Sequence, residues 1–489
     1  MTRLSAETLN ALPQSVEAPA YDRQAVTLGI VHLGIGAFHR AHMASYVDAC
    51  LPDDPRWGIC GVSLRSSATK NALGPQDGLY TLGVQSSQGL TPRIIGAVKD
   101  LIVAPESPES VAERLSDPAI RIVSLTVTEK GYCHDPATGR LNADHPDIAH
   151  DLTTANFPRT AVGWLAHGLL ARKAASIAPF TILSCDNLPS NGQTVRQVLA
   201  DFLEHKAPDA VDWFASEVTC PSTMVDRIVP ATTDEDRVAV DRALGVQDAW
   251  PVITEPFTQF VVEDHFTLGR PNWEAHGVTM AEDVEPFERM KLRMLNGSHS
   301  TLAYLGYLAG DETVADTMAD PSFKRLIGDL MTEEIKPTLS MPPEVDLIAY
   351  RDALLERFSN AALKHRTWQI AMDGSQKLPQ RLLGTIRDRL DSGQSFDRLA
   401  LGVAAWMRYA LGADEQGNAI DVRDPMADDF AKIPSTNAVE TVQAFLGIMQ
   451  IFGTDLPNEP AFVRTVTDKF AQLQQDGARA TISAHASDS

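Results

Sequence analysis

The sequence lacks the features by which several large classes of protein are recognised. Its five cysteines are scattered and include no C-x-x-C pair, so neither a zinc ribbon nor a disulfide framework is indicated, and we expect reduced thiols. No uncharged apolar run is long enough to span a membrane. The segment Met1–Asn10 lacks the apolar core of a signal peptide. We therefore expect a cytoplasmic protein that does not contact membranes.

Positive charge is also scarce. The 489 residues include 42 Lys and Arg against 64 Asp and Glu, which gives a formal net charge of -22. A chain this acidic is a poor partner for nucleic acid or for an anionic membrane. An anionic substrate would need a local cluster of Lys, Arg or helix N-termini. We expect a monomer or a weak homo-oligomer.

Metal-binding motifs are missing as well. The pair His39-x-x-His42 has no acidic partner of the H-E-x-x-H kind. No set of Cys, His and Glu suited to zinc stands out elsewhere in the sequence. We therefore expect a protein that binds no metal.

Near the N-terminus, an apolar strand runs into a glycine turn and then a helix. The strand and turn occupy residues 25–36, and Ala37–Asp48 has a helical pattern. This order, with Gly34-x-Gly36 at the turn, is typical of the first unit of a dinucleotide-binding fold. His39 fills the third position of the fingerprint, so the motif is incomplete. The cofactor contacts predicted here are Gly34, Ile35, Gly36, Ala37, Phe38 and His39.

The next predicted strands end in polar residues. After the strand Trp57–Leu64, the position that commonly holds an acid for the ribose has Arg65 instead, which leaves room for a 2′-phosphate or for an arginine stacked on adenine. An ordinary polar loop is the alternative. The strand Arg121–Thr128 is followed by Glu129, and the strand Phe180–Cys185 by Asn187. Open α/β sheets bind ligands at such strand ends, so we expect cofactor contacts from Thr128, Glu129 and Asn187.

Strands and helices alternate to about residue 230, which predicts a Rossmann-type, doubly wound parallel sheet of the α/β class. From about residue 284, helical periodicity dominates, for example over Leu347–Phe358. We predict a dinucleotide-binding domain over residues 1–284 and an all-α domain that binds substrate and carries catalysis over residues 285–489.

The segment Lys291–Ser300 opens the predicted helical domain. At about 100° per residue, Asn296 lies about 140° and His299 about 80° round a helix from Lys291. A lysine, an amide and an imidazole could then converge on one small ligand and support proton transfer. The alternative is a surface lysine on a helix whose Asn and His satisfy their neighbours.

Together these segments resemble the long-chain polyol dehydrogenases, the mannitol 2-dehydrogenase and fructuronate reductase family. The resemblance covers nearly the whole chain, in the expected order, and rests on Val31–His42, Ile122–Tyr132, Ser184–Leu188, Met224–Pro230 and Lys291–His299. Within the family, the chain looks most similar to the fructuronate reductase (D-mannonate oxidoreductase) branch, through Met290–Ser300, His365–Arg381, Val403–Tyr409 and Asp414–Asp421. The resemblance implies a Rossmann domain and a helical domain with the site between them, and no metal.

The resemblance also implies roles for individual residues. Lys291 would be the catalytic acid/base, Asn187 and Asn296 would hold the reacting oxygen, and His299 would orient the substrate. Asp226, within the matching Met224–Pro230 stretch, would contact the cofactor. Mannitol-type members carry an acidic pair where this chain has Ser67-Ala68, so we expect use of NAD with NADP also possible.

The reaction that the resemblance implies is D-mannonate plus NAD giving D-fructuronate plus NADH. Mannitol 2-dehydrogenase activity, or action on another polyol or hexuronate, is the alternative within the family, and a nucleotide-sensing regulatory protein is the non-enzymatic one. No Tyr-x-x-x-Lys occurs, which argues against the short-chain dehydrogenase mechanism. We expect a cationic segment to bind a substrate carboxylate, unless its arginines pair with acids of the helical domain. The residues of this segment are His365, Arg366, Lys377 and Arg381.

Overall fold

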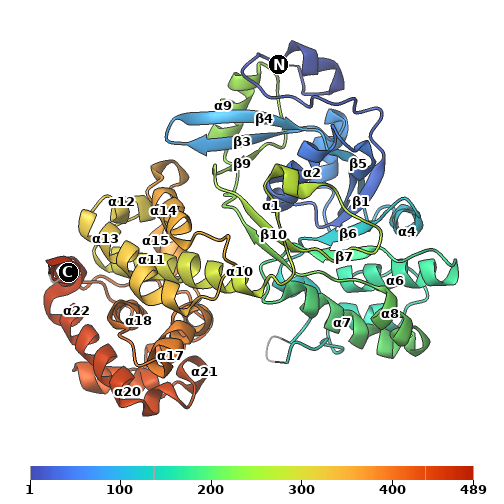
Figure 1. The fold of residues 1–489 in the computed structure, drawn as a ribbon. Coiled ribbons are helices and arrows are strands. Elements are labelled where there is room, and N and C mark those ends of the chain that lie inside the picture. The colour runs from blue at the N-terminus through green and yellow to red at the C-terminus, as the bar shows by residue number, and fades with distance from the viewer. Residues whose placement is uncertain (1, 136–137, 436, 488–489) are drawn as a thin grey trace. The chain divides into compact units, whose positions relative to one another are not determined.

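The computed structural model describes residues 2–135, 138–435 and 437–487 (Figure 1). The chain divides into two compact units, Met1–Glu285 and Pro286–Ser489. Among the described residues, no helix is both long enough and apolar enough to cross a lipid bilayer.

A five-stranded parallel sheet forms the centre of the first unit. Its order is β5-β2-β1-β6-β7, and all four strand pairs are parallel. The order reverses at β1, so the C-terminal end of β1 is the switch point at which such sheets bind ligands. The prediction of a doubly wound α/β domain is confirmed. The strands are β1 (Leu28–Leu33), β2 (Gly58–Ser63), β5 (Val98–Val103), β6 (Ile122–Leu125) and β7 (Thr181–Ser184).

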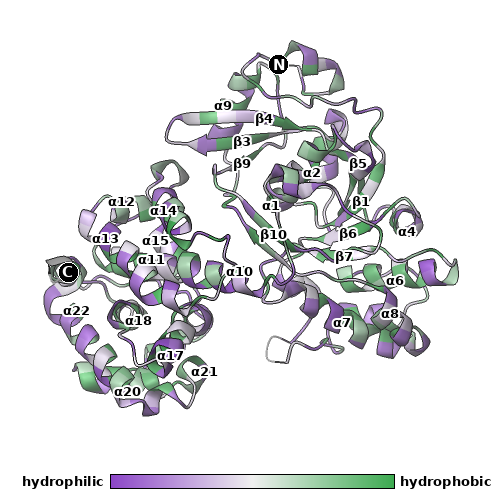
Figure 2. Ribbon diagram, viewed as in Figure 1, coloured by the Kyte–Doolittle hydropathy of each residue, from purple (hydrophilic) through white to green (hydrophobic). Residues whose placement is uncertain are grey.

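Both faces of this sheet are covered, which explains why β1, β6 and β7 are buried along nearly their whole length (Figure 2). Val31 and Leu33 face a cluster that includes residues of α4 (Pro108–Ser116), α6 (Ala161–Ala174) and α7 (Asn191–Lys206). Ile30 belongs to a second cluster, which includes α2 (Met43–Cys50). The helix predicted over residues 37–48 is two helices, because the backbone breaks at His42 between α1 (Ala37–Ala41) and α2.

Two small sheets complete the first unit. Residues 80–95 form a hairpin that strand prediction left unassigned, because Gly83 and Pro92 interrupt its pattern. The first sheet joins β3 (Tyr80–Ser86), β4 (Gly89–Ile95) and β9 (Val252–Thr254). The second joins β8 (Thr223–Asp226), β10 (Gln259–Glu263) and β11 (Thr279–Ala281).

The second unit is helical, and its described residues include no β-strand longer than an isolated bridge. The all-α prediction is therefore confirmed. The predicted helix Leu347–Phe358 is α14 (Leu347–Phe358). The apolar run after His299 lies in α11 (Ser298–Leu308), which packs against α18 (Asp397–Ala410).

The expectation of a regular α-helix over residues 291–297 is wrong. This stretch is a π-helical turn, η7 (Lys291–Gly297), between α10 (Glu285–Met290) and α11. A π-helix closes each backbone turn with i→i+5 rather than i→i+4 hydrogen bonds. Asn296, five residues after Lys291, therefore lies about one turn further along, as a residue four positions on does in an α-helix. The predicted angle of about 140° between Lys291 and Asn296 does not hold.

Candidate active site

The predicted glycine turn lies at the C-terminal end of β1. Gly34 has a φ of +91°, and a Cβ there would lie 2.2 Å from the Thr126 carbonyl oxygen. Only glycine meets both conditions without strain. A Cβ on Gly36 would meet nothing closer than the Gly34 oxygen at 3.8 Å. Gly36 is exposed and begins α1 as its N-cap, and its N–H donates to the Gly34 carbonyl oxygen at 2.7 Å.

A cavity of about 420 Å³ opens at this turn, within the first unit. It lies at the C-terminal ends of β1, β2 and β6. Five of the predicted cofactor contacts line it: Gly34, Ile35, Gly36, Arg65 and Thr128. The rest of its wall is Ser63, Leu64, Ser66, Thr69, Val127, Lys130, Gly131, Cys133, His145, Asp147, Arg159, Thr160 and Ala161.

The other predicted cofactor residues lie outside this lining. His39 is fully buried, with its ring stacked on His32 at a centroid separation of 3.4 Å. The ring of Phe38 stacks on His42 at 5.1 Å. Ala37 is half-buried, Glu129 and Asn187 are exposed, and Asp226 is buried at the end of β8. Ser67 and Ala68 do not line the cavity, although their neighbours Ser66 and Thr69 do.

Burial determines the charge state of the two stacked histidines. Burial lowers the pKa of His32 to about 3, and it lowers the pKa of His39 well below the ordinary value of 6.5, with His32 and Arg40 adding to the shift. The His32 nitrogens lie 2.8 Å from Ser124 Oγ and from Thr126 Oγ1. Both imidazole rings are therefore neutral in the folded protein.

A half-buried carboxylate connects the ends of β6 and β7. Asp186 accepts hydrogen bonds from the backbone N–H groups of Val127 at 2.9 Å and Thr128 at 3.0 Å. The Tyr132 hydroxyl also donates to it, at 2.8 Å. Thr128 has φ +64° and ψ 162°, a conformation that costs a non-glycine residue about 1–3 kcal/mol.

Asp186 therefore holds a strained residue in the cavity wall, and burial raises the pKa of this carboxyl. It is a positioning residue that sequence reasoning passed over. Its signal was its place at a strand end, directly before Asn187.

In the second unit, the π-helical turn brings candidate catalytic residues close to a second helix. Lys291 is only 8% exposed, and Asn296 is half-buried. A Cβ on Gly297 would lie 2.7 Å from the Arg381 carbonyl oxygen. This close approach fixes η7 against a second π-helical turn, η11 (Pro379–Leu383), which carries Arg381. π-Helical turns of this kind occur often at functional sites.

The imidazole of His299 lies among aromatic rings and cations. Its ring stacks on Phe358 at 5.2 Å with an interplanar angle of 9°, and the His365 ring lies 4.8 Å away. Burial lowers the pKa of His299 well below its ordinary value, and His365, Arg381, Arg357 and Lys377 lower it further. His299 is therefore a neutral ring in a positively charged environment.

The cationic segment predicted for a carboxylate divides into two parts. The exposed Arg366 lies 3.7 Å from the Glu312 carboxylate, so this arginine pairs with an acid of its own unit. Arg381 instead donates to Ser300 Oγ at 3.0 Å. Lys377 donates to the Met372 carbonyl oxygen at 2.5 Å.

Neither Arg381 nor Lys377 forms an ion pair within the part of the chain that the structure describes. Burial lowers the pKa of both groups; Arg381 lowers the pKa of Lys377 further, whereas Asp373 and Asp424 raise it. The cluster of His299, His365, Arg357, Lys377 and Arg381 is thus suited to an anion. Arg357, on α14, is the member that sequence reasoning missed, because only the fold brings it here.

Over residues 2–135, 138–435 and 437–487, no group of three or more His, Cys, Asp or Glu side chains is arranged to hold a metal ion. That the reaction needs no metal stays a prediction.

Comparison with known proteins identifies the family of this chain. Residues 28–275 match the mannitol dehydrogenase Rossmann domain, and residues 283–474 match the mannitol dehydrogenase C-terminal domain. The chain belongs to the mannitol dehydrogenase family. It is therefore an oxidoreductase, as the resemblance implied.

Three similar proteins show the range of this family. "Uncharacterized oxidoreductase YeiQ" of Escherichia coli (strain K12) is 48% identical over 471 residues, which is 96% of either chain. The D-mannonate oxidoreductase of the same strain is 47% identical over 476 residues, 96% of this chain and 98% of that one. The solved Pseudomonas fluorescens mannitol 2-dehydrogenase, a ternary complex with NAD and D-mannitol, is 38% identical with a TM-score of 0.85 and covers 100% of both chains.

Proposed function

We propose that this protein is an NAD-dependent dehydrogenase that interconverts D-mannonate and D-fructuronate. The observation that carries the proposal is the pair of cations on the helical unit, Lys377 and Arg381, which form no ion pair among the described residues. Support also comes from the 47% identity to a D-mannonate oxidoreductase. The family includes a mannitol 2-dehydrogenase at 38% identity, so the substrate has to be argued from the site itself.

Charge distinguishes the two substrate classes. A hexonate or hexuronate carries a carboxylate, whereas mannitol and fructose are neutral. A cation that loses solvent without gaining a counterion costs free energy. Burial lowers the pKa of both Lys377 and Arg381, which is the signature of that cost. A substrate carboxylate would offset it, and arginine can bind a carboxylate through two parallel hydrogen bonds.

The residues of the first unit fit a nicotinamide dinucleotide. The Gly34 turn, the exposed Gly36 and the N-terminus of α1 form the kind of cradle that binds a pyrophosphate. Arg65 and Thr128 line the same cavity and would contact the adenosine half. When bound, the cofactor supplies the hydride acceptor and donor.

The side chains would manage the proton and the oxygen. In the oxidation of D-mannonate, the carbinol carbon loses a hydride and Lys291 accepts the proton of its hydroxyl group, which leaves the ketone of D-fructuronate. The side-chain amides of Asn187 and Asn296 would stabilise the charge that develops on this oxygen. The neutral ring of His299 would orient the substrate. In the reverse direction, Lys291 returns the proton.

Substitution of the two cations tests the proposal. In Lys377→Gln and Arg381→Gln, the KM for D-fructuronate should rise by roughly tenfold or more, because a charge-assisted contact is lost. The KM for D-fructose, which has no carboxylate, should change far less. Arg366→Gln is the matched control, because this guanidinium is exposed and paired with Glu312. Equal losses on both substrates would mean that the cluster is structural.

Mannitol 2-dehydrogenase activity is the second candidate. It is favoured by the solved relative in complex with D-mannitol, which matches this chain over its whole length. A wild-type protein that prefers mannitol to mannonate would establish it. The non-enzymatic candidate, a nucleotide-sensing regulator, predicts nucleotide binding without turnover of any polyol or hexonate. The oligomeric state, predicted as monomer or weak homo-oligomer, can be measured by light scattering.

A further inference from the structure

The cofactor cavity has a charged wall that the roles above do not use. Besides Arg65, its lining contains the cations Lys130 and Arg159, and Asp147 is its single carboxylate. The wall is thus positively charged in a protein whose net charge is -22. A local field of this sign attracts a multiply charged anion.

A buried carboxylate fixes the backbone of Arg159. Asp151 is 2% exposed and accepts hydrogen bonds from the Arg159 N–H at 2.8 Å and the Thr160 N–H at 2.9 Å. The Thr160 hydroxyl also donates to Asp151, at 2.7 Å, and accepts from the Gly163 N–H at 2.9 Å, which caps α6. A Cβ on Gly163 would lie 2.4 Å from Asp151 Oδ2. Arg159 therefore begins from a rigid backbone.

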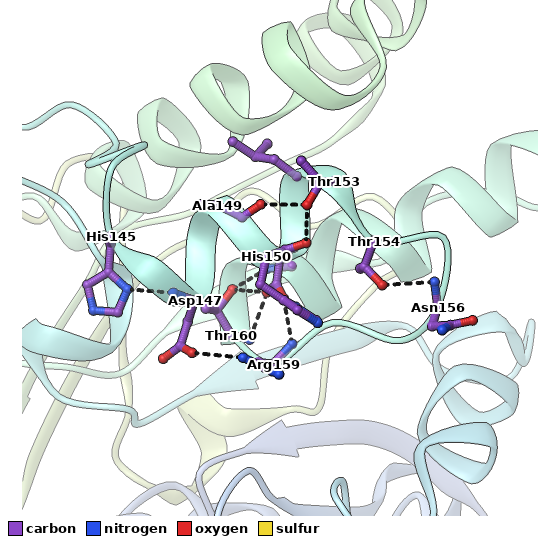
Figure 3. Close-up of polar contacts among 12 residues, drawn as sticks. His145, Asp147, Ala149, His150, Thr153, Thr154, Asn156, Arg159 and Thr160 are labelled. Carbon is purple, nitrogen blue, oxygen red and sulfur yellow. Dashed lines mark hydrogen bonds and ion pairs between the residues drawn. The ribbon is translucent and has the colours of Figure 1, made fainter.

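The side chain of Arg159 is held far more weakly (Figure 3). Its guanidinium lies 3.7 Å from the Asp147 carboxylate, and the two side chains are 62% and 44% exposed. Such an exposed ion pair contributes little to stability. The Asp147 N–H donates to the His145 ring at 3.2 Å, which keeps this acid at the start of α5 (Pro146–Thr153). A stronger anion can therefore draw Arg159 away from Asp147.

The thiol of Cys133 lies in the same cavity as this wall and the end of β2. Burial raises the pKa of Cys133, Asp147 and Asp151 raise it further, and Arg65 lowers it. Cys133 lines the same cavity. Arg65 from the β2 side and Asp147 and Arg159 from the α5 side therefore line one cavity together with Cys133.

We propose that Arg159 is a specificity-determining residue for the cofactor, which joins Arg65 in binding the 2′-phosphate of NADP while Asp147 limits that binding. The inference rests on the proposed function in that the cavity takes the adenosine half of the cofactor. The end of β2 is where the ribose 2′ position is recognised in such folds. In this chain Arg65, Ser66 and Thr69 line the cavity there, without an acid to repel a phosphate. The pyrophosphate belongs to the turn at Gly34 and Gly36.

The test uses two small probes, 2′,5′-ADP and 5′-AMP, which differ by the 2′-phosphate and need no substrate. Dissociation constants are measured by titration calorimetry on the full chain. Arg159→Ala should weaken 2′,5′-ADP by about tenfold, the usual loss for one charge-assisted contact, and change 5′-AMP by less than about twofold. Asp147→Asn should tighten 2′,5′-ADP, because it removes the competing carboxylate. Arg159→Lys should keep most of the affinity.

Arg56→Ala is the matched control. Arg56 is an arginine of similar exposure, 69%, paired with Asp54 at 2.9 Å, and it precedes the N-terminal end of β2. It should leave both dissociation constants unchanged.

Equal weakening of both probes in Arg159→Ala, or no change in either, would overturn the inference, as would unchanged or weaker binding of 2′,5′-ADP in Asp147→Asn. Because the readout is binding, a protein that shows the expected pattern but oxidises no hexonate would refute the proposed function alone.

Discussion

The contact between the two π-helical turns allows a quantitative prediction. In Gly297→Ala, the new methyl group would start 2.7 Å from the Arg381 carbonyl oxygen, and ordinary contact begins at 3.4 Å. The obstacle is backbone, so η7 and η11 must move apart by several tenths of an ångström. Overpacking of this kind costs about 1–3 kcal/mol, and the gain from replacing glycine by alanine in a helix returns about 1 kcal/mol. The net loss of stability should be about 0–2 kcal/mol.

The effect on turnover should exceed the effect on stability. Lys291 and Asn296 lie on η7, so the movement shifts both relative to Arg381. Since a misplacement of about 1 Å can cost about 10²-fold in rate, we expect kcat to fall on the order of tenfold or more. The assay is NADH consumption with D-fructuronate, together with urea unfolding of the same preparations.

Gly328→Ala is the matched control for this experiment. Gly328 lies in α13 (Pro321–Asp329), and a Cβ there would meet only Leu355 Cδ1, at 3.7 Å. This variant should gain about 0.5–1 kcal/mol of stability and keep its turnover. If Gly297→Ala behaves like Gly328→Ala in both measurements, the two turns are not rigidly coupled and the reasoning fails.

Three further predictions address the acid/base, the strand-end carboxylate and the buried histidines. Lys291→Ala should lower kcat by about 10² to 10⁴ while the Kd for NAD stays constant, because the described cofactor cavity is lined only by the first unit; wild-type turnover would remove Lys291 from the mechanism. Asp186→Asn leaves one acceptor oxygen for two backbone donors, so the strained Thr128 should relax and the Kd for NAD should rise by about tenfold; an unchanged Kd would show that Asp186 does not shape the cavity. His32 and His39 are neutral when folded, and the unfolded chain protonates them below pH 6.5. The free energy of unfolding should therefore fall as the pH drops from about 6.5 towards 5, by up to about 1.4 kcal/mol per pH unit for each histidine, and a flat profile in urea titrations would contradict this.

Continuous apolar runs made β1, β2, β6 and β7 predictable, whereas β5 was not assigned because Lys99 and Asp100 interrupt its apolar pattern. Strands buried on both faces leave a strong pattern, and the glycine turn after β1 gave the location of the cavity. The same reasoning could not assign β3 and β4, whose sequences contain Gly83 and Pro92. Nor could it anticipate the π-helical turn at Lys291, because a shift from i→i+4 to i→i+5 hydrogen bonds has no residue signature of its own.

Long-range geometry limited the prediction of the site. Arg366, Lys377 and Arg381 look equivalent in the sequence, and only the structure distinguishes the ion-paired Arg366 from the other two. Arg159 and Asp147 follow β6 by at least 20 residues, so only the fold returns them to the cavity, where the hydrogen bonds of Asp151 hold the backbone of Arg159. His39 was predicted from its place in the fingerprint, but burial against His32 removes its side chain from the cavity wall.

Initial rates on the wild-type protein test whether the helical unit recognises a carboxylate. D-Fructuronate, D-tagaturonate, D-fructose and D-mannitol should each be measured with NAD(H) and with NADP(H). We expect kcat/KM for D-fructuronate with NADH to exceed that for D-fructose by about 10² or more, the worth of two charge-assisted contacts. A higher kcat/KM for D-fructose or D-mannitol than for the uronates would contradict the account.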